Sequence, residues 1–378
     1  MSARTVALIA AGTDGGGAVS SRIAAMAGGL RRRGWDVDIH DVAPMQVSAA
    51  QRVLDRSPAW ARARLERLGI EGDVTPSTVW RAQPCLAATS ADIAIVSVPP
   101  FSLLAAGVLA LPPGLPWIAD YRDPWSARAK PSPLARFTRH AERIAVAKCA
   151  AVTFAGGSRL ADLLAARLHV SRGKIVSVPN GHDPSDVAGL TPHRPRTERN
   201  GTPLDLVFGG YWYGRNGPGI LPDALARVGA RVAQLTVIGD IAPSVEVDVL
   251  RAIGDSYRVV PPMPRPQLYQ RLAHADAAII PLDSSSAIES RIPAKVYDCL
   301  ATGVPIIALC PGNAALLRVP GGERIHHIAH RDTRKLAELL AGAADDRSAL
   351  RSGPLRAGTT RDVGVERLDR LLRSVCEG

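Results

Sequence analysis

The sequence is poor in lysine and in aromatic residues, and both shortages bear on what the chain can bind. Only five of its 46 basic residues are lysines, and Phe, Trp and Tyr make up 4% of the chain. The aromatic-rich strand motifs of RNA-binding domains are absent. The arginines are spread along the chain and cluster only in "LRRRGW" (30–35). The net charge of +11 therefore gives little support to nucleic-acid binding, and we expect no nucleic-acid partner.

Cysteine is equally scarce, and its pattern excludes several kinds of site. The five cysteines are odd in number and widely separated, with no CxxC or Cys/His spacing typical of zinc. No HExxH motif, carboxylate-rich metal loop or Ser/His/Asp ordering is present. We therefore expect free thiols in a reducing compartment, and neither a bound metal nor a cofactor.

Long hydrophobic runs are also missing. No apolar stretch approaches the roughly 18–20 residues that cross a bilayer. The opening segment "MSARTVALIAAGTDGGG" has an apolar run of only about six residues, which is short for a secretory signal and typical of a buried strand. We expect a cytoplasmic protein without an integral membrane segment. "LRRRGW" is too short for a membrane-docking helix, although peripheral membrane contact stays open.

What the sequence does contain is an alternation of short apolar runs and longer amphipathic stretches. "TVALIAAG" (5–12) and "DIAIVSVPP" (92–100) are typical of buried strands, and 20–34 is typical of an amphipathic helix. This alternation indicates parallel βαβ units. It is interrupted by "TPHRPRTERNGTP" (191–203), whose composition favours a linker, and it then resumes.

The predicted fold class is therefore α/β, with two consecutive domains of similar size. We assign 1–192 to the first domain and 203–360 to the second. Residues 363–378 carry apolar side chains at helical spacing and predict a final helix within 361–378.

One of the rare lysines lies in "SRIPAKVYDCLATGVPIIAL" (290–309). Pro293 suits the first turn of a helix, and Gly303 is a good C-terminal stop. This helix follows a polar loop after an apolar strand, where open α/β sheets bind anions. Lys295 would add a positive charge there, and Asp298, about one turn on, would face the same side. A surface Lys–Asp pair on an ordinary helix explains the spacing equally well.

Two glycine-rich loops also follow predicted strands. In "VFGGYWYGRNGPGILPDAL" (207–225), Gly209 and Gly210 would let the backbone approach a ligand, and Arg215 could grip a diphosphate. "AGTDGGGAVSSR" (11–22), with Gly15, Gly16 and Gly17, lacks GxGxxG spacing and is not a P-loop. Each loop is also compatible with a plain βα turn.

A dense set of charges follows another strand in "ADYRDPW" (119–125). The set comprises Asp120, Arg122 and Asp123, and its carboxylates could position a hydroxyl or accept a proton. A loop stabilised by internal ion pairs is the alternative.

Together, the order of the glycine-rich first loop, "DYRDPW", "VPNGHD", "GGYWYGRNGP" and "IPAKVYDCLATGVPIIA" resembles the bacterial retaining glycosyltransferases of family 4. The resemblance spans nearly the whole chain. It implies the GT-B fold, in which two Rossmann-like domains face each other across a cleft and a C-terminal helix crosses back to the N-terminal domain.

By position, the resemblance assigns the nucleotide diphosphate-sugar to the second domain. Arg215 and Lys295 would neutralise the departing diphosphate. Asp298 stands where the family usually has a ribose-binding Glu, Gly210 with Gly209 would lie under the phosphates, and Met263 in "VVPPMP" would border the base.

The resemblance also suggests contacts for the sugar and the acceptor. Asp120 would touch the sugar or acceptor as a catalytic group, and Arg122 and the Gly15–Gly17 loop would contact the acceptor. Many relatives have a Glu-x7-Glu pair. The first Glu would contact the donor sugar, but its position here is occupied by Ser290, with Glu289 one residue away.

The activity implied is sugar transfer with retention of configuration, from a UDP- or GDP-type donor and without a metal requirement. A soluble small-molecule acceptor, such as an intermediate in natural-product or antibiotic biosynthesis, is the leading expectation. Exopolysaccharide or lipid-linked glycan assembly is the alternative. Functions of other classes are a nucleotide-sugar epimerase or hydrolase, or a non-catalytic nucleotide-sugar binder. The protein is expected to be a monomer or a homodimer.

Overall fold

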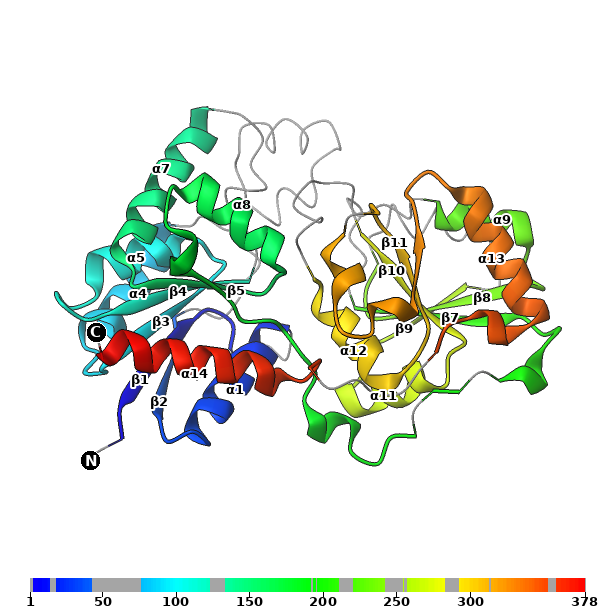
Figure 1. Ribbon diagram of the computed structural model, residues 1–378, viewed down its shortest axis with the longest axis horizontal. Helices are drawn as coiled ribbons and strands as arrows, with labels where there is room; N and C mark the ends of the chain where they lie inside the picture. The colour runs from blue at the N-terminus through cyan, green and yellow to red at the C-terminus, as the bar shows by residue number, and fades with distance from the viewer. Residues whose placement is uncertain are drawn as a thin grey trace. The chain divides into compact units, whose positions relative to one another are not determined.

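The chain forms two compact units. Unit 1 comprises Met1–Asn180 together with Arg361–Gly378, and unit 2 comprises Gly181–Thr360 (Figure 1). The computed structural model describes residues 3–13, 18–42, 76–122, 133–191, 193–194, 196–210, 220–241, 254, 257–282, 292–312, 314–352 and 358–377.

Unit 1 contains a six-stranded parallel sheet with strand order β2-β1-β3-β4-β5-β6. Its strands are β1 (Thr5–Ala10), β2 (Asp36–Asp41), β3 (Ile93–Val98), β4 (Trp117–Tyr121), β5 (Ala151–Phe154) and β6 (Ile175–Ser177). Its helices are α1 (Ala18–Arg31), α4 (Pro76–Ala87), α5 (Ser102–Ala110), α7 (Pro133–Lys148), α8 (Ser158–Leu168), the short η1 (Arg172–Lys174) and α14 (Arg361–Glu377).

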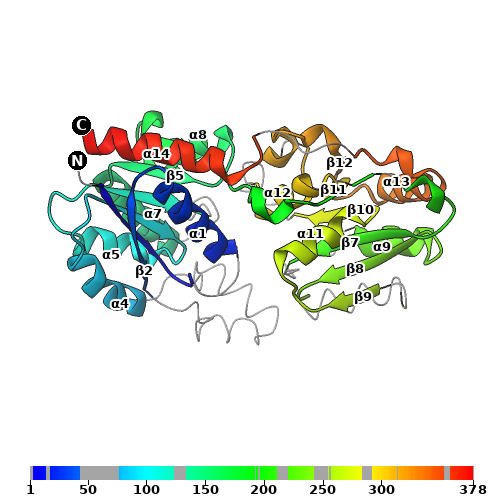
Figure 2. The ribbon, with the colours of Figure 1, turned by 90° about the horizontal axis from the view of Figure 1, so that it is seen from below.

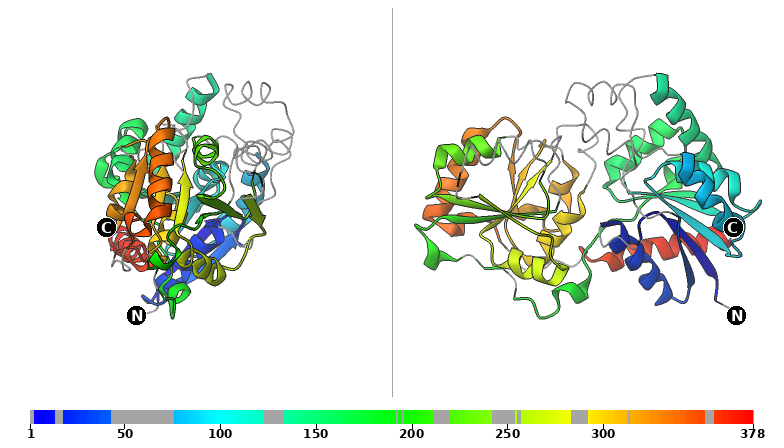
Figure 3. Two further views of the ribbon diagram at one scale, coloured as in Figure 1. Left: turned by 90° about the vertical axis from the view of Figure 1, so that its right-hand side faces the viewer. Right: turned by 180° about the vertical axis from the view of Figure 1, so that it is seen from behind.

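The inner strands of this sheet are largely apolar on both faces because helices cover both. Along β1, Val6 and Leu8 pack with α1 and α14, whereas Ala7 and Ile9 pack into the cluster that includes α4, α5, α7 and α8. Figure 3 shows these helices on the two sides of the sheet. The two-sided burial explains why the strands appear in the sequence as continuous apolar runs.

The predicted final helix is confirmed as α14, which packs against α1 within unit 1 (Figure 2). The indole Nε1 of Trp35 donates a hydrogen bond to Asp369 at 2.6 Å. The contact is close because of a glycine: a Cβ on Gly29 of α1 would lie only 2.6 Å from Val365 Cγ1. Unit 1 is therefore assembled from two segments that are distant in the sequence.

Unit 2 contains a second six-stranded parallel sheet, with strand order β12-β11-β10-β7-β8-β9. Its strands are β7 (Leu204–Gly209), β8 (Ala233–Ile238), β9 (Tyr257–Val260), β10 (Ala277–Pro281), β11 (Ile306–Leu309) and β12 (Ile325–Ile328). Its helices are α9 (Leu221–Val228), α11 (Arg265–Ala273), α12 (Ala294–Thr302), α13 (Thr333–Asp345), and the short η2 (Pro184–Val187), η3 (Thr197–Arg199), η7 (Ala315–Arg318), η8 (Gly322–Arg324) and η9 (Arg347–Ala349).

Here too the strands are covered on both faces. Leu206 and Phe208 of β7 pack with α9 and α13, and Val207 packs with α11 and α12. Helix α12, which carries the predicted donor residues Lys295 and Asp298, thus packs on the same face of the sheet as Val207.

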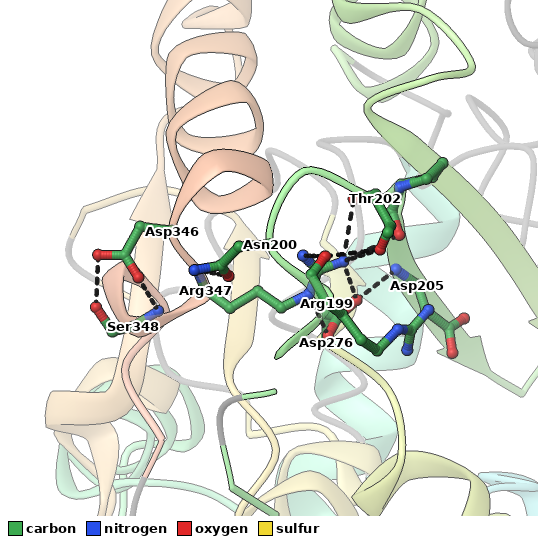
Figure 4. Close-up of polar contacts among 9 residues, drawn as sticks. Arg199, Asn200, Thr202, Asp205, Asp276, Asp346, Arg347 and Ser348 are labelled. Carbon is green, nitrogen blue, oxygen red and sulfur yellow. Dashed lines mark hydrogen bonds and ion pairs between the residues drawn. The ribbon is translucent and has the colours of Figure 1, made fainter. Parts of the chain in front are cut away.

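The predicted linker 191–203 differs from expectation because much of it packs on unit 2. The His193 N–H donates to the Thr302 carbonyl at 2.9 Å. Arg347, which is 1% exposed, pairs with Asp276 at 2.9 Å and donates to the Arg199 and Thr202 carbonyls (Figure 4). The contact boundary between the units accordingly falls at Gly181, before the proline- and arginine-rich stretch.

Among the residues described above, no helix is both long and apolar enough to span a bilayer. Within the same ranges, the His, Cys, Asp and Glu side chains form no group of three that would hold a metal ion. All five cysteines carry free thiols.

Candidate functional site

The predicted helix after Pro293 is confirmed as α12, which ends at Gly303 in the left-handed conformation (φ 76°). Pro293 occupies the N-cap with an extended backbone and has no side-chain acceptor to offer the first-turn N–H groups. Helix α12 begins shortly after β10, which neighbours β7 in the sheet. Its N-terminus therefore combines a positive dipole end with the Lys295 side chain.

Lys295 reaches across to the end of β7. Its Nζ lies 4.1 Å from the centroid of the buried Phe208 ring. A Cβ placed on Gly210 would lie 3.7 Å from the same Nζ. Cation–π attraction, of about 0.5–2 kcal/mol, holds the ammonium beside the backbone that follows β7.

Two glycines, one directly after β7 and one directly after β8, allow the backbones at these two strand ends to approach each other closely. Gly210 has φ 109° and Gly239 has φ 129°, values that residues with a side chain rarely adopt. A Cβ on Gly239 would lie 2.6 Å from the Gly210 carbonyl oxygen. The glycines thus allow two backbone segments to pack closely, with Gly239 as a partner that the sequence reasoning missed, and the approach of a ligand to Gly209 and Gly210 stays a prediction.

Asp298 lies one turn beyond Lys295 and is held by neighbours from α11. The Tyr269 hydroxyl donates to Asp298 Oδ1 at 2.8 Å, and Arg265 Nη2 donates to the same oxygen. Arg265 Nη2 also donates to the Tyr269 hydroxyl at 3.0 Å, and Nε pairs with Asp186 of η2 at 3.3 Å. No donor from the described residues reaches Asp298 Oδ2.

The electrostatics of this group follow from its burial and its opposite charges. Burial, and then the Asp298 carboxylate, raise the pKa of the Tyr269 phenol well above its ordinary value. Burial alone would lower the pKa of Arg265, but Asp298, Tyr269 and Asp186 raise it overall. At neutral pH the group therefore holds a guanidinium cation and a neutral phenol next to Asp298.

Asp120, predicted as a catalytic group in unit 1, is fully buried and saturated with hydrogen bonds. Arg22 of α1 donates to both of its oxygens, at 2.7 and 3.2 Å, while Ser97 and Thr153 each donate at 2.8 Å. Burial would raise the pKa of Asp120, but Arg22 and the two hydroxyls hold it below the usual value. A contact with a sugar or acceptor would require this network to open. In the structure, the Asp120 carboxylate instead binds Arg22 and holds its guanidinium in place.

Arg22 continues this network to the end of unit 1. It donates to the Val178 carbonyl at 3.1 Å and to the Asn180 side chain at 3.0 Å. Asn180 is the last residue of the first segment of unit 1. The Arg22–Asp120 pair therefore fixes the position from which the chain leaves this unit.

The remaining predicted residues are distributed between the two units. In unit 2, Gly209 ends β7, and Met263 lies between β9 and α11 and packs on the core. In unit 1, Arg122 directly follows β4 and its N–H donates to the Val98 carbonyl at 2.9 Å. The predictions for Gly15, Gly16, Gly17, Arg215 and Ser290 lie outside the described residues.

Sequence reasoning missed Arg22, Arg265 and Tyr269. Arg22 lies in a predicted amphipathic helix, and nothing near it in the sequence indicates a carboxylate partner. Arg265 and Tyr269 are spaced i, i+4 just after "VVPPMP", which predicts that they share a helix face but not that this face meets Asp298.

Comparisons with known proteins agree with this architecture. Residues 17–181 match the model of the glycosyl transferase 4-like domain, a segment that lies almost wholly within unit 1. No curated protein matches the sequence significantly.

Solved structures match over the whole chain. Sucrose-phosphate synthase from Thermosynechococcus elongatus has a TM-score of 0.66 at 16% identity, covering 99% of this chain and 96% of the other. HepE from Anabaena, solved with UDP-glucose, has 0.57 at 16% identity, covering 99% and 98%. AviGT4, a glycosyltransferase of avilamycin A biosynthesis, has 0.54 at 15% identity, covering 99% and 98%.

A structure assigned as a UDP-N-acetylglucosamine 2-epimerase from Listeria monocytogenes also matches, with a TM-score of 0.56 at 14% identity over 99% and 97% of the two chains. At such identities the matches establish the fold. The chain has the GT-B fold, as the motifs implied.

Proposed function

We propose that the protein is a retaining glycosyltransferase whose unit 2 binds a nucleotide diphosphate-sugar. The observation that carries the proposal is the placement of Lys295 at the N-terminus of α12, with its Nζ over Phe208 and beside Gly210. A cation, a helix N-terminus and close-packed glycine backbone are the groups that a diphosphate needs. The match of residues 17–181 to a glycosyl transferase 4-like domain supports the same reading.

In this proposal the reaction breaks the bond between the anomeric carbon and the diphosphate oxygen. The bond electrons leave with the diphosphate, and Lys295, with Arg215, stabilises the charge that develops there. The acceptor heteroatom forms the new bond to the anomeric carbon and loses its proton to the released diphosphate or to water. These side chains supply the positive charge, so we propose that no metal is required and that EDTA leaves turnover unchanged.

The remaining donor contacts follow the order of the motifs. Asp298 accepts a ribose hydroxyl, Gly209 and Gly210 lie under the phosphates, Met263 borders the base, and Ser290 contacts the sugar. On the acceptor side, we propose that Arg122 and Gly15–Gly17 touch the acceptor. Asp120, whose oxygens accept from Arg22, Ser97 and Thr153, is proposed to act there through Arg22.

For the acceptor, we propose a soluble small molecule of natural-product or antibiotic biosynthesis, with exopolysaccharide or lipid-linked glycan assembly as the alternative. The fold shared with AviGT4 is compatible with the first of these. A cytoplasmic location is part of the proposal, because all five cysteines carry free thiols, as expected in a reducing compartment.

The test is a panel of UDP-, GDP- and dTDP-sugars offered with and without candidate acceptors, read out as nucleotide release. Release that depends on the acceptor, with the product anomer matching the donor by NMR, is the expected result. Nucleotide release or sugar isomerisation without an acceptor would instead favour a hydrolase or an epimerase. Epimerase is the activity assigned to one of the matched structures. Binding without either reaction would identify a non-catalytic binder.

A further inference from the structure

The two carboxylate oxygens of Asp298 differ in their hydrogen bonds. Oδ1 accepts hydrogen bonds from both the Tyr269 hydroxyl, at 2.8 Å, and the Arg265 guanidinium. Oδ2 accepts none from the described residues, although the side chain is only 15% exposed. A carboxylate held at one oxygen by two donors cannot rotate freely, so the direction of the other oxygen is fixed.

The group that holds Oδ1 is itself immobilised. Tyr269 is fully buried, and the Arg265 guanidinium carbon lies 5.7 Å from the centroid of the Tyr269 ring. At its other side, Arg265 Nε pairs with Asp186 at 3.3 Å. One arginine therefore joins η2, α11 and α12, and Asp298 is fixed from outside its own helix.

Asp298 lies on the same side of α12 as the proposed diphosphate site. Asp298 follows Lys295 by three residues, so the two side chains share one face of the helix. Lys295 extends along that face to the end of β7. Aspartate is one methylene shorter than glutamate, so Oδ2 can sample fewer positions. Whether it reaches a ligand therefore depends on the orientation of the carboxylate before the ligand binds.

We propose that Arg265 and Tyr269 are positioning residues that hold Asp298 by Oδ1, so that Oδ2 accepts a ribose hydroxyl, and that they thereby determine the preference for the donor's ribose. This inference rests on the proposed function, since it assumes that a nucleotide binds beside Lys295. It assigns to Arg265, Tyr269 and Asp186 a role in ligand selection in place of surface ion pairing.

The experiment measures binding of UDP and GDP, each with its 2′-deoxy and 3′-deoxy forms, by calorimetry. The wild type is expected to bind the better ribonucleotide about 10-fold or more tightly than at least one deoxy form, as for a charge-assisted hydrogen bond. Arg265→Met and Tyr269→Phe are expected to reduce that ratio to within about threefold by weakening only the ribonucleotide. Asp298→Asn should also reduce it, and Arg265→Met should then add nothing further.

Arg271→Met is the matched control. Arg271 lies on the same helix and pairs with Asp205 at 2.6 Å, with both side chains 22% exposed, but it does not touch Asp298. It should keep the wild-type ratio, which separates positioning from general stabilisation of α11. Tyr269→Phe keeps the buried ring, so it remains informative if Arg265→Met folds poorly.

Each contrary outcome has a distinct meaning. The inference is overturned if Arg265→Met and Tyr269→Phe keep the wild-type ratio, if all affinities fall in parallel, or if the wild type does not distinguish ribose from its deoxy forms. If the wild type binds no nucleoside diphosphate at all, the proposed function fails first and the inference falls with it.

Discussion

At the scale of single residues, each unit contains a buried arginine–aspartate pair that joins residues far apart in the sequence. Arg22 meets Asp120 and Arg347 meets Asp276, with all four side chains at most 7% exposed. Removing one partner of such a pair leaves the other charge buried and uncompensated, which costs about 3–5 kcal/mol. These pairs therefore hold the segments that they join in fixed positions.

Lys295 is where a single residue should matter most for turnover. Lys295→Met is expected to lower the rate of sugar transfer by roughly 10²–10³, because it removes a preorganised charge from the developing diphosphate anion. The fold should survive, because Lys295 is only partly buried and methionine is a good helix former. Turnover and donor binding by calorimetry are the measurements, with the exposed Lys335→Met as the control. A Lys295→Met variant as active as wild type would reduce Lys295 to an ordinary surface lysine.

His193 should make the stability of unit 2 dependent on pH. It is 6% exposed, and burial lowers its pKa from 6.5 to about 4. Below pH 6.5 the unfolded histidine binds a proton that the folded one does not, so stability is constant above that pH and falls between 6.5 and about 4. The free energy of unfolding should drop by about 2 kcal/mol between pH 7 and pH 5 through this residue alone.

Urea unfolding at pH 7 and pH 5 measures this change in the free energy of unfolding. In His193→Gln, the part of the change that comes from His193 should be lost. The exposed His169→Asn is the control, because its ring is hydrated in both states. An unchanged pH dependence in His193→Gln would contradict the assignment.

At the scale of elements, the close contact between α1 and α14 depends on a glycine, Gly29, which has no side chain. Gly29 and Gly28 are neighbours on α1, yet only Gly29 faces Val365 of α14. A Cβ on Gly28 would meet nothing closer than Arg32 Nη1 at 3.6 Å, whereas one on Gly29 would clash with Val365 at 2.6 Å. The stiff β-branched Val365 has no easy rotamer in which to move aside.

Gly29→Ala is therefore expected to destabilise unit 1 by about 1–3 kcal/mol, through overpacking. Gly28→Ala, the adjacent control, should be neutral or stabilising by about 0.5–1 kcal/mol, because alanine suits a helix interior better than glycine. Thermal or urea unfolding gives both values. Gly29→Ala should cost less when Val365→Ala is already present, and equal effects of the two glycine substitutions would disprove the contact.

The same elements show what a sequence can predict. Strands β1 and β3 and helices α12 and α14 were predictable because burial on two faces, or on one stripe, leaves a periodic local pattern. The partners of buried charges leave none: Arg22 and Asp120 are 98 positions apart, and Arg265 and Asp298 are 33 apart. The stretch 191–203 has the composition of a linker, and its packing depends on distant partners such as Thr302 and Arg347.

At the scale of the whole molecule, the two units differ in how the chain builds them. Unit 2 is one continuous segment with its own apolar clusters on both faces of its sheet. Unit 1 takes α14 from beyond unit 2 to complete the cluster around α1. The units therefore respond differently to being expressed alone.

A fragment of residues 181–360 is expected to fold and to bind the same nucleoside diphosphate as the intact chain, without turnover, because Lys295, Asp298 and Arg265 all lie within it. Circular dichroism and calorimetry check this. The complementary fragment 1–180 exposes the apolar face of α1 and should aggregate unless a peptide of residues 361–378 is added. A fragment 181–360 that folds but does not bind, while the intact chain does, would place part of the donor site in unit 1.

The return of α14 has a consequence for the order in which the protein matures on the ribosome. The strands of unit 1 are synthesised first together with most of their covering helices, but α14 arrives only after all of unit 2 has been translated. During that interval the apolar residues that pack against α14 stay uncovered in the nascent first half, and a chaperone could protect them there. Unit 2 can finish folding while unit 1 waits, so the half made later is completed earlier.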